Sequence, residues 1–185
     1  KLLPLTLRPG QAPNKPGKLW HHAEHLGKGY QWMQRSEITG GFVYAALPFI
    51  DQAQKEGKPF YLNLWPDDVH SPYWPPVDKW GDGKKRTLYL AVLEEMDRQL
   101  GKLFDRVRND TELVDSTMIL ICSDNGPDPG AGSALPLRGY KTHLYEGGIR
   151  SPLVAWAPGL MNKESAGTVN KTSVFSAMDL VPSLV

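Results

Sequence analysis

Apolar residues recur at helical spacing in two long stretches of the chain. The first runs from Thr39, a residue type that caps helix N-termini, to Gly57, a residue type that ends helices. Its apolar face comprises Phe42, Ala45, Ala46, Phe49, Ile50 and Ala53. The second runs from about Arg86 to Arg108, with apolar positions at Leu90, Leu93, Met96, Leu100, Leu103, Phe104 and Val107. This spacing predicts two amphipathic helices that each bury one face.

Three short apolar runs lie between and after these helices, at residues 59–65, 116–122 and 152–156. Each run has the length of a strand and consists mainly of apolar residues, which predicts a strand buried on both faces. Strands that alternate with long helices predict an α/β sandwich with a largely parallel central sheet.

The first 38 residues differ from the rest of the chain. Four prolines interrupt any regular pattern there, and Gly, Lys and His are frequent. We therefore expect residues 1–38 to form an irregular connecting segment and residues 39–185 to form the folded domain.

Composition excludes several classes of protein. The 185 residues carry 21 basic and 20 acidic side chains, a net charge of +1. Without a basic excess, we expect no nucleic-acid partner. No apolar run approaches the roughly 18 residues of a membrane span, so we expect none.

Ser123-Asp-Asn-Gly126 directly follows a predicted buried strand. Functional sites of open α/β sheets gather beyond the carboxyl ends of strands. The carboxylate of Asp124 and the amide oxygen of Asn125 suit a hard cation such as Ca²⁺. The same residues also favour a plain turn, which is the alternative interpretation.

Residues 137–152 combine glycines with four basic side chains, those of Arg138, Lys141, His143 and Arg150. Glycines let the backbone approach a ligand, and cations suit a tetrahedral oxyanion such as sulfate or phosphate. A solvated basic loop is the alternative.

A Pro- and Trp-rich loop follows the first predicted strand and contains His70. His70 could bind an anion or protonate a leaving group, although a histidine in a loop is usually structural or exposed. Asp67 and Asp68 precede it and could bind metal or stabilise a turn.

Together these segments resemble the arylsulfatase-like sulfatase family of the alkaline phosphatase superfamily. The resemblance rests on Ser123-Asp-Asn-Gly126, then Leu137-Arg-Gly-Tyr-Lys141, then Tyr145-Glu-Gly-Gly-Ile-Arg-Ser-Pro152, in that order. Pro59-Phe-Tyr-Leu62 with the later His70-Ser-Pro72 also fits the family. The resemblance implies an alkaline phosphatase-like sandwich with a mostly parallel central sheet, incomplete in this chain.

The resemblance also implies roles for individual residues. Asp124 and Asn125 match calcium ligands of the family. Lys141 and His70 match catalytic residues that contact the sulfate. Arg138 counts with the substrate-binding residues, although we expect it to brace the site, and His143 is expected behind the site.

The family's nucleophile is a formylglycine made from Cys or Ser within Cys/Ser-x-Pro-x-Arg, and no such pentapeptide occurs here. Cys122 precedes Ser123 within a predicted strand and is expected to be a buried structural thiol. We therefore expect a partial catalytic domain, inactive alone and completed by the remainder of the catalytic domain.

The implied function is hydrolysis of sulfate esters, with one Ca²⁺ and a sulfated small molecule or glycan as substrate. A periplasmic, secreted or lysosomal location is implied as well. Two alternatives stay open: a phosphate or phosphonate ester hydrolase of the same superfamily, and a non-catalytic module that binds sulfated glycans.

Overall fold

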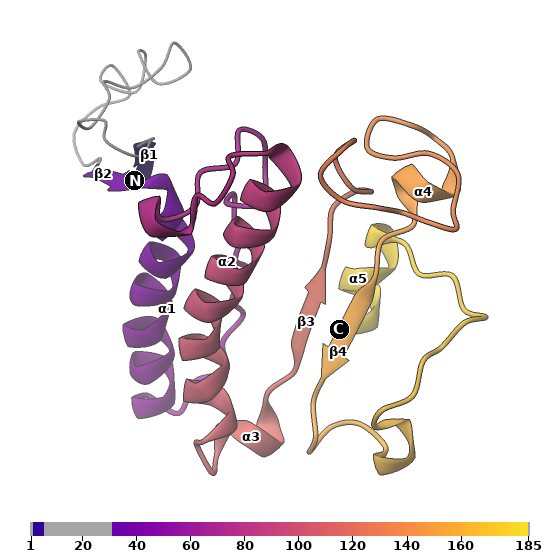
Figure 1. Cartoon of the computed structure of the whole chain (residues 1–185). Coiled ribbons are helices and arrows are strands. Elements are labelled where there is room, and N and C mark those ends of the chain that lie inside the picture. Colours follow the sequence, from indigo (N-terminus) through magenta and orange to yellow (C-terminus); the bar gives the residue numbers. More distant parts are fainter. Residues whose placement is uncertain (1, 6–30, 185) are drawn as a thin grey trace.

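The computed structural model describes residues 2–5 and 31–184, with side chains described from Gln34 to Ser183. Two helices lie side by side, and a strand pair with long loops lies beside the second helix (Figure 1). The strands are β1 (Leu2–Leu5), β2 (Gln31–Gln34), β3 (Ile119–Cys122) and β4 (Leu153–Trp156). The α-helices are α1 (Ile38–Lys55), α2 (Lys85–Arg108), α3 (Leu113–Ser116), α4 (Glu146–Ile149) and α5 (Ala177–Leu184). Short 3₁₀ turns are η3 (Arg35–Glu37), η4 (Val77–Lys79) and η5 (Lys163–Ser165).

The segment expected to be irregular contains regular structure in its described part. β1 and β2 pair in parallel, with Leu2 opposite Gln31, and η3 follows directly. Residues 6–30 of that segment lie outside the described residues.

The two predicted helices are confirmed as α1 and α2, and they run in the same direction. Gln99 of α2 contacts Gly40 near the start of α1, and Arg106 contacts Asp51 near its end. Gly57 ends the first helix in the left-handed region, at φ +62°, as the sequence predicts. The main apolar core lies between these helices and comprises Val43, Ala46, Ile50, Leu103, Val107 and Leu113.

The buried faces are rotated relative to the predicted ones. On α1, Val43 is buried whereas Phe49 is 48% exposed. On α2, Leu90 and Leu93 are exposed. Polar Gln99 is buried instead, because its amide group donates to the carbonyl oxygen of Ser36 (2.6 Å). A satisfied amide can therefore replace an apolar side chain on the buried face.

The prediction of a strand at residues 59–65 is wrong, because these residues form no hydrogen-bonded ladder with another described segment. Its burial nevertheless alternates with period two. Phe60, Leu62 and Leu64 pack against the main core, whereas Tyr61 and Trp65 are exposed. The side-chain pattern of a strand is thus present without a pairing partner.

The other two predicted strands are confirmed, but they pair antiparallel, with Ile119 opposite Trp156 and Cys122 opposite Leu153. The first begins at Ile119 rather than at Ser116, because Ser116 is the last residue of α3 and the next two residues precede the ladder. The connection from residue 123 to 152 leaves and re-enters at the same end of the pair, which requires antiparallel strands. The largely parallel sheet is therefore not confirmed.

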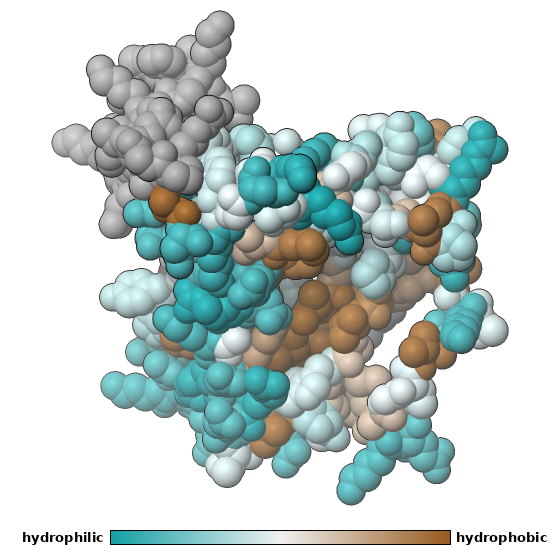
Figure 2. All heavy atoms as spheres, in the orientation of Figure 1, coloured by the Kyte–Doolittle hydropathy of each residue, from teal (hydrophilic) through white to brown (hydrophobic). Residues whose placement is uncertain are grey.

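One face of this strand pair is only partly covered. Ile119 and Trp156 pack against the helical core, whereas Ile121 and Val154, on the same face, are 45% and 55% exposed. Figure 2 shows apolar side chains gathered in the middle of the molecule, between the helices and the C-terminal part. Cys122, expected to be buried, is exposed.

Candidate functional site

Asp124 and Asn125 lie in the turn that directly follows β3. The hydroxyl of Ser123 donates to the carbonyl oxygen of Asn125 (2.9 Å) and closes the turn. Asp124 is exposed and Asn125 half-buried. Among the described residues, neither side chain makes a hydrogen bond or ion pair. The segment is therefore both a turn and a pair of available oxygen donors.

Three glycines pack this turn against the Tyr-Glu-Gly-Gly segment, backbone on backbone. A Cβ on Gly126 would lie 1.9 Å from the carbonyl oxygen of Gly147. A Cβ on Gly148 would lie 2.0 Å from that of His143. The amide of Gly126 donates to Gly148 (2.8 Å), and that of Gly147 donates to Arg138 (2.7 Å). Only glycine permits this approach, which explains the motif in physical terms.

The same packing ties the backbone of Lys141 to the segment that follows Asp124 and Asn125. The backbone amide of Lys141 donates to the carbonyl oxygen of Pro127, two residues after Asn125 (3.0 Å). The Lys141 side chain is half-buried, forms no close ion pair with another described residue, and interacts electrostatically with the Asp128 carboxylate. We call residues 123–128 and 137–149 the glycine platform, because it gathers Asp124, Asn125 and Lys141 on one support.

The residues after Lys141 form a tight turn with an unusual backbone. Thr142 has φ +76°, in the left-handed region that β-branched residues rarely adopt. The amide of His143 donates to the carbonyl oxygen of Tyr140 (3.0 Å), and their rings lie 4.0 Å apart between centroids. His143 is thus engaged within the platform, and its buried Nδ1 has no partner among the described residues.

Arg138 of the platform and Arg150, which directly follows it, are both occupied by platform side chains. The guanidinium of Arg138 lies over the ring of Tyr145, 3.9 Å from its centroid, which is a cation–π contact. Arg150 pairs with Glu146 (3.0 Å) on the surface. This arrangement agrees with a bracing role for Arg138.

His70 lies exposed on the loop of residues 66–84, which we call the His70 loop. Its Nδ1 is 2.8 Å from the carbonyl oxygen of Ser71. Because a carbonyl oxygen only accepts, the contact places a proton on Nδ1. Nε2 is then free to accept a proton in the neutral ring or to donate one in the imidazolium.

Arg35 holds the loop that carries His70, and sequence reasoning missed this residue because it lies in the segment expected to be irregular. Arg35 is 8% exposed. Its guanidinium donates to the backbone carbonyls of Asp67 (2.8 Å) and His70 (3.3 Å). It also pairs with the Asp67 carboxylate (3.2 Å).

Asp68 is a second anchor of the same loop. It is 3% exposed, and its carboxylate accepts a short hydrogen bond from the hydroxyl of Thr39. Burial, which outweighs the Thr39 bond and the charge of Arg35, raises the pKa of the Asp68 carboxyl. Both aspartates of the loop therefore serve to fix it to the start of α1.

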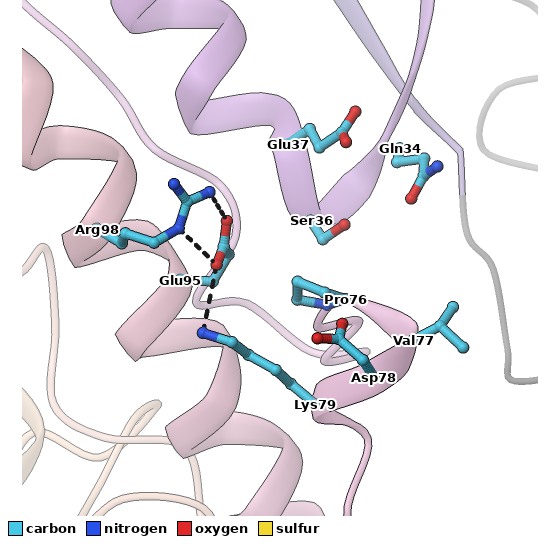
Figure 3. A pocket seen from close by; sticks show the side chains of 9 residues that line it. All are labelled: Gln34, Ser36, Glu37, Pro76, Val77, Asp78, Lys79, Glu95 and Arg98. Atoms are coloured by element: carbon cyan, nitrogen blue, oxygen red, sulfur yellow. Dashed lines mark hydrogen bonds and ion pairs between the residues drawn. The ribbon is translucent and has the colours of Figure 1, made fainter.

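A cavity of about 580 Å³ is lined by residues of η3, η4 and α2 (Figure 3). Its polar lining includes Gln34, Glu37, Asp78, Lys79, Glu95 and Arg98. Both cations already pair with Glu95, Lys79 at 3.5 Å and Arg98 through a short bond. None of the residues that the sequence assigns to the site lines it.

The described residues contain no group of three or more His, Cys, Asp or Glu side chains arranged to hold a metal ion. Asp124 and Asn125 contribute two oxygen donors, fewer than the six to eight that Ca²⁺ takes. Within the described ranges, no helix has the length and apolar character needed to cross a bilayer.

Comparison with known proteins places this geometry in a family. The sulfatase family model matches residues 26–185. Arylsulfatase G of Mus musculus is 30% identical over 178 residues, covering 88% of this chain and 32% of the relative. N-acetylgalactosamine-6-sulfatase of Homo sapiens is 31% identical over 180 residues, covering 91% of this chain and 33% of the relative. The chain thus spans about a third of the length of these curated relatives.

Solved structures agree. Ps i-CgsB in complex with k-i-k-neocarrahexaose superposes with a TM-score of 0.59 at 30% identity, covering 65% of this chain and 28% of that one. PsFucS1 sulfatase from Pseudoalteromonas sp. gives a TM-score of 0.55 at 29% identity, covering 73% and 28%. The platform motifs, the family match and these structures lead to one conclusion: the chain belongs to the sulfatase family.

Proposed function

We propose that this chain is part of an enzyme that hydrolyses sulfate esters, with the glycine platform and the His70 loop as two sides of its sulfate site. The observation that carries the proposal is the backbone packing of the platform. It ties the backbone of Lys141 to Pro127, two residues after Asn125, which supports a site in which the Lys141 ammonium lies near the turn of Asp124 and Asn125. A cation beside a divalent-metal site is suited to bind and polarise a tetrahedral oxyanion.

Lys141 and His70 divide the work in this proposal. The ammonium of Lys141 binds a sulfate oxygen and stabilises the negative charge that develops there. The Nε2–H of His70, in the imidazolium form, donates to the ester oxygen that leaves. The contact between Nδ1 and Ser71 supports this role because it orients the ring. Arg138 braces the platform through Tyr145 and is a weaker candidate for substrate contact.

Asp124 and Asn125 are the proposed calcium ligands. Their unbonded oxygens fit a hard cation, and further oxygen ligands must come from elsewhere to complete its coordination. When bound, Ca²⁺ would supply positive charge that offsets the charge of the sulfate oxygens. Two ligands alone predict weak binding by this chain.

The chain offers no residue for the family's formylglycine, since the sequence lacks Cys/Ser-x-Pro-x-Arg and Cys122 lies at the end of β3. We propose that the remainder of the catalytic domain supplies the nucleophile and that this chain is inactive alone. No covalent step is assigned to the residues described here.

The substrate class in this proposal is a sulfated small molecule or glycan. One relative is named N-acetylgalactosamine-6-sulfatase, and one similar structure is a complex with k-i-k-neocarrahexaose. We also propose an exported or lysosomal location, as the family implies, which cell fractionation can test.

The proposal is tested on the natural protein that contains this chain, with 4-methylumbelliferyl sulfate and the matching phosphate ester as substrates. We expect faster hydrolysis of the sulfate ester and a loss of roughly 100-fold or more in kcat/KM on Lys141→Ala. The matched control is Lys102→Ala, because Lys102 is exposed on α2 and has no described partner.

A faster reaction with the phosphate ester would favour the phosphate or phosphonate hydrolase. Binding of sulfated glycans with no hydrolysis of either ester, from a protein of confirmed intact mass, would favour the non-catalytic module. Equal effects of the Lys141 and Lys102 substitutions would refute the assigned role of Lys141.

A further inference from the structure

The two sides of the proposed sulfate site are anchored to different parts of the molecule. Arg35 and Thr39 fix the His70 loop to the start of α1. The glycine platform is fixed to the end of β3 and to itself, through bonds such as that from Gly126 to Gly148. A site shared by the two loops therefore needs a link that sets their separation.

One hydrogen bond between side chains joins the two loops. The hydroxyl of Tyr73, three residues after His70, donates to the carboxylate of Asp128 (2.9 Å). Asp128 directly follows Pro127, whose carbonyl oxygen accepts from the amide of Lys141 (3.0 Å). The bond thus lies a few residues from His70 on one side and one residue from the support of Lys141 on the other.

The N-terminal turn of α2 holds Asp128 in place. Lys85 forms an ion pair with the Asp128 carboxylate (3.0 Å) and donates to the carbonyl oxygen of Pro129 (2.7 Å). Arg86 donates to the carbonyl oxygen of Ala131 (2.6 Å). Three polar contacts from consecutive residues of one long helix give Asp128 a rigid support.

The Tyr73 ring is held independently of its hydroxyl. Tyr73 is 5% exposed and packs in a small apolar cluster with Val92 and Ala131. Its ring meets that of Tyr89 edge to face, with centroids 5.5 Å apart. Replacing tyrosine by phenylalanine therefore removes the bond to Asp128 and keeps the packing.

Both partners keep the protonation states that the bond requires. Burial and the hydrogen bond to Asp128 raise the pKa of the Tyr73 phenol, so that it stays a donor. Burial acts to raise the pKa of Asp128, but the bonds from Lys85 and Tyr73 outweigh it and hold that pKa below its usual range. The carboxylate therefore stays an acceptor at neutral pH.

We infer that Tyr73 and Asp128 are a positioning pair that sets the distance between His70 and Lys141, so that one oxyanion can contact both. The inference rests on the proposed function, because it assigns the pair to the same sulfate site. Neither residue touches the substrate in this view. Their effect on the site acts through the two loops that they join.

The test is a titration of the isotopically labelled chain with inorganic sulfate, followed by NMR at the His70 ring and at the Lys141 side chain. In the unmodified chain, both signals should report one dissociation constant, because one ion contacts both groups. In Tyr73→Phe, we expect the constant seen at His70 to weaken by about fivefold or more. The constant at Lys141 should change by less than about twofold, since the platform keeps its own contacts.

Two further variants sharpen the result. Asp128→Asn should weaken the constant at His70 as Tyr73→Phe does, and it should also change the constant at Lys141, because the Asp128 carboxylate interacts electrostatically with that ammonium. At His70, the double variant Tyr73→Phe/Asp128→Asn should be no worse than the stronger single one. The control is Tyr44→Phe, because Tyr44 is 82% exposed on α1 and has no described hydrogen bond. Identical constants at His70 and Lys141 in Tyr73→Phe, or additive effects in the double variant, would overturn the positioning role.

The failure of the proposed function has a different signature. If sulfate moves neither signal in the unmodified chain, the proposed sulfate site is refuted for this chain. The link is then judged by amide hydrogen exchange, in which Tyr73→Phe should speed exchange of residues 67–71 by roughly fivefold relative to residues 119–122. Unchanged exchange there would overturn the link as well.

Discussion

The helix pair and the glycine platform are held together in opposite ways. Between α1 and α2, buried side chains such as Val43, Ile50 and Leu103 fill the contact, and their backbones stay apart. In the platform, the backbones themselves touch, and large side chains such as Leu144 (90% exposed) point away. Side-chain packing tolerates exchange between apolar residues of similar volume, whereas backbone contact tolerates only the absence of a side chain.

The largest expected effect tests this contrast with one methyl group in each region. Gly148→Ala places a Cβ 2.0 Å from the carbonyl oxygen of His143 and 2.6 Å from that of Tyr140. Because backbone atoms cannot move aside without opening the platform, we expect a loss of about 3 kcal/mol or more in the free energy of unfolding. Urea denaturation with two probes, far-UV circular dichroism and tryptophan fluorescence, measures it.

The matched control lies in the helix pair. Gly101, within α2, has no heavy atom within 4 Å of a built Cβ. Gly101→Ala should therefore stabilise the chain by roughly 0.5–1 kcal/mol, as expected for a helix interior. Similar losses from the two substitutions would show that the platform is not distinguished by backbone contact.

A smaller effect is expected where a polar side chain joins the helix pair to the His70 loop. Arg35→Lys keeps the charge but cannot reach both carbonyl oxygens and the Asp67 carboxylate together. We expect a loss of about 2 kcal/mol, because the buried arginine would no longer donate to all the loop oxygens that it holds. Chemical denaturation gives this value, and faster amide exchange around His70 should accompany it.

Arg108→Lys provides the comparison for Arg35, since Arg108 pairs with Asp105 and both side chains are more than half exposed. An exposed pair contributes little, so the change should be within about 0.5 kcal/mol. A loss of that size from Arg35→Lys as well would mean that Arg35 does not fix the loop.

The same contrast explains what the sequence could predict. Helix periodicity located α1 and α2, because their burial repeats every turn, yet it misplaced the buried faces. Gln99 and Glu95 occupy buried positions of α2 through hydrogen bonds, and a hydropathy pattern does not register such partners. Arg35 was missed because it lies in the segment expected to be irregular, and its partners are backbone carbonyls and Asp67, which hydropathy does not register either.

The strand predictions failed in pairing rather than in pattern. Residues 60–64 alternate in burial as a strand does, but a ladder needs a second strand that no local sequence signal specifies. The antiparallel pairing of β3 and β4 follows from the path of the long connection. That path depends on the contacts of Gly126, Gly147 and Gly148, which the motif signals only through its resemblance to the family.

Two aspartates of the helical half should respond to pH in opposite directions. Burial raises the pKa of Asp68 in the folded state above 3.8, the ordinary value of an aspartate. Its contribution to stability is therefore present below pH 3.8 and is lost as the pH rises through the raised pKa. Asp110 accepts from the amide of Leu113 and from Arg106, which lowers its pKa to about 2. Its contribution is present above 3.8 and is lost as the pH falls towards about 2.

Unfolding midpoints measured from pH 2 to 7 separate these contributions. Asp68→Asn should reduce the fall in stability that occurs as the pH rises above 3.8. Asp110→Asn should reduce the fall in stability that occurs as the pH drops towards about 2. The hydroxyl of Thr39 keeps an oxygen acceptor in Asp68→Asn, so the local contact survives. A profile that either substitution shifts uniformly, without changing its slope, would contradict the assigned cause.

The smallest effect returns to the platform and to a residue beside Lys141. Thr142 has φ +76°, where a β-branched side chain crowds the backbone at a cost of about 1–3 kcal/mol. Glycine removes this strain but adds conformational freedom to the unfolded chain, at a cost of about 0.5–1 kcal/mol. Thr142→Gly should therefore raise the free energy of unfolding by roughly 0.5 kcal/mol, whereas Thr39→Gly, which deletes the bond to Asp68, should lower it. A clear loss of stability from Thr142→Gly would mean that the threonine side chain supports the platform, and that this region depends on more than contacts between backbones.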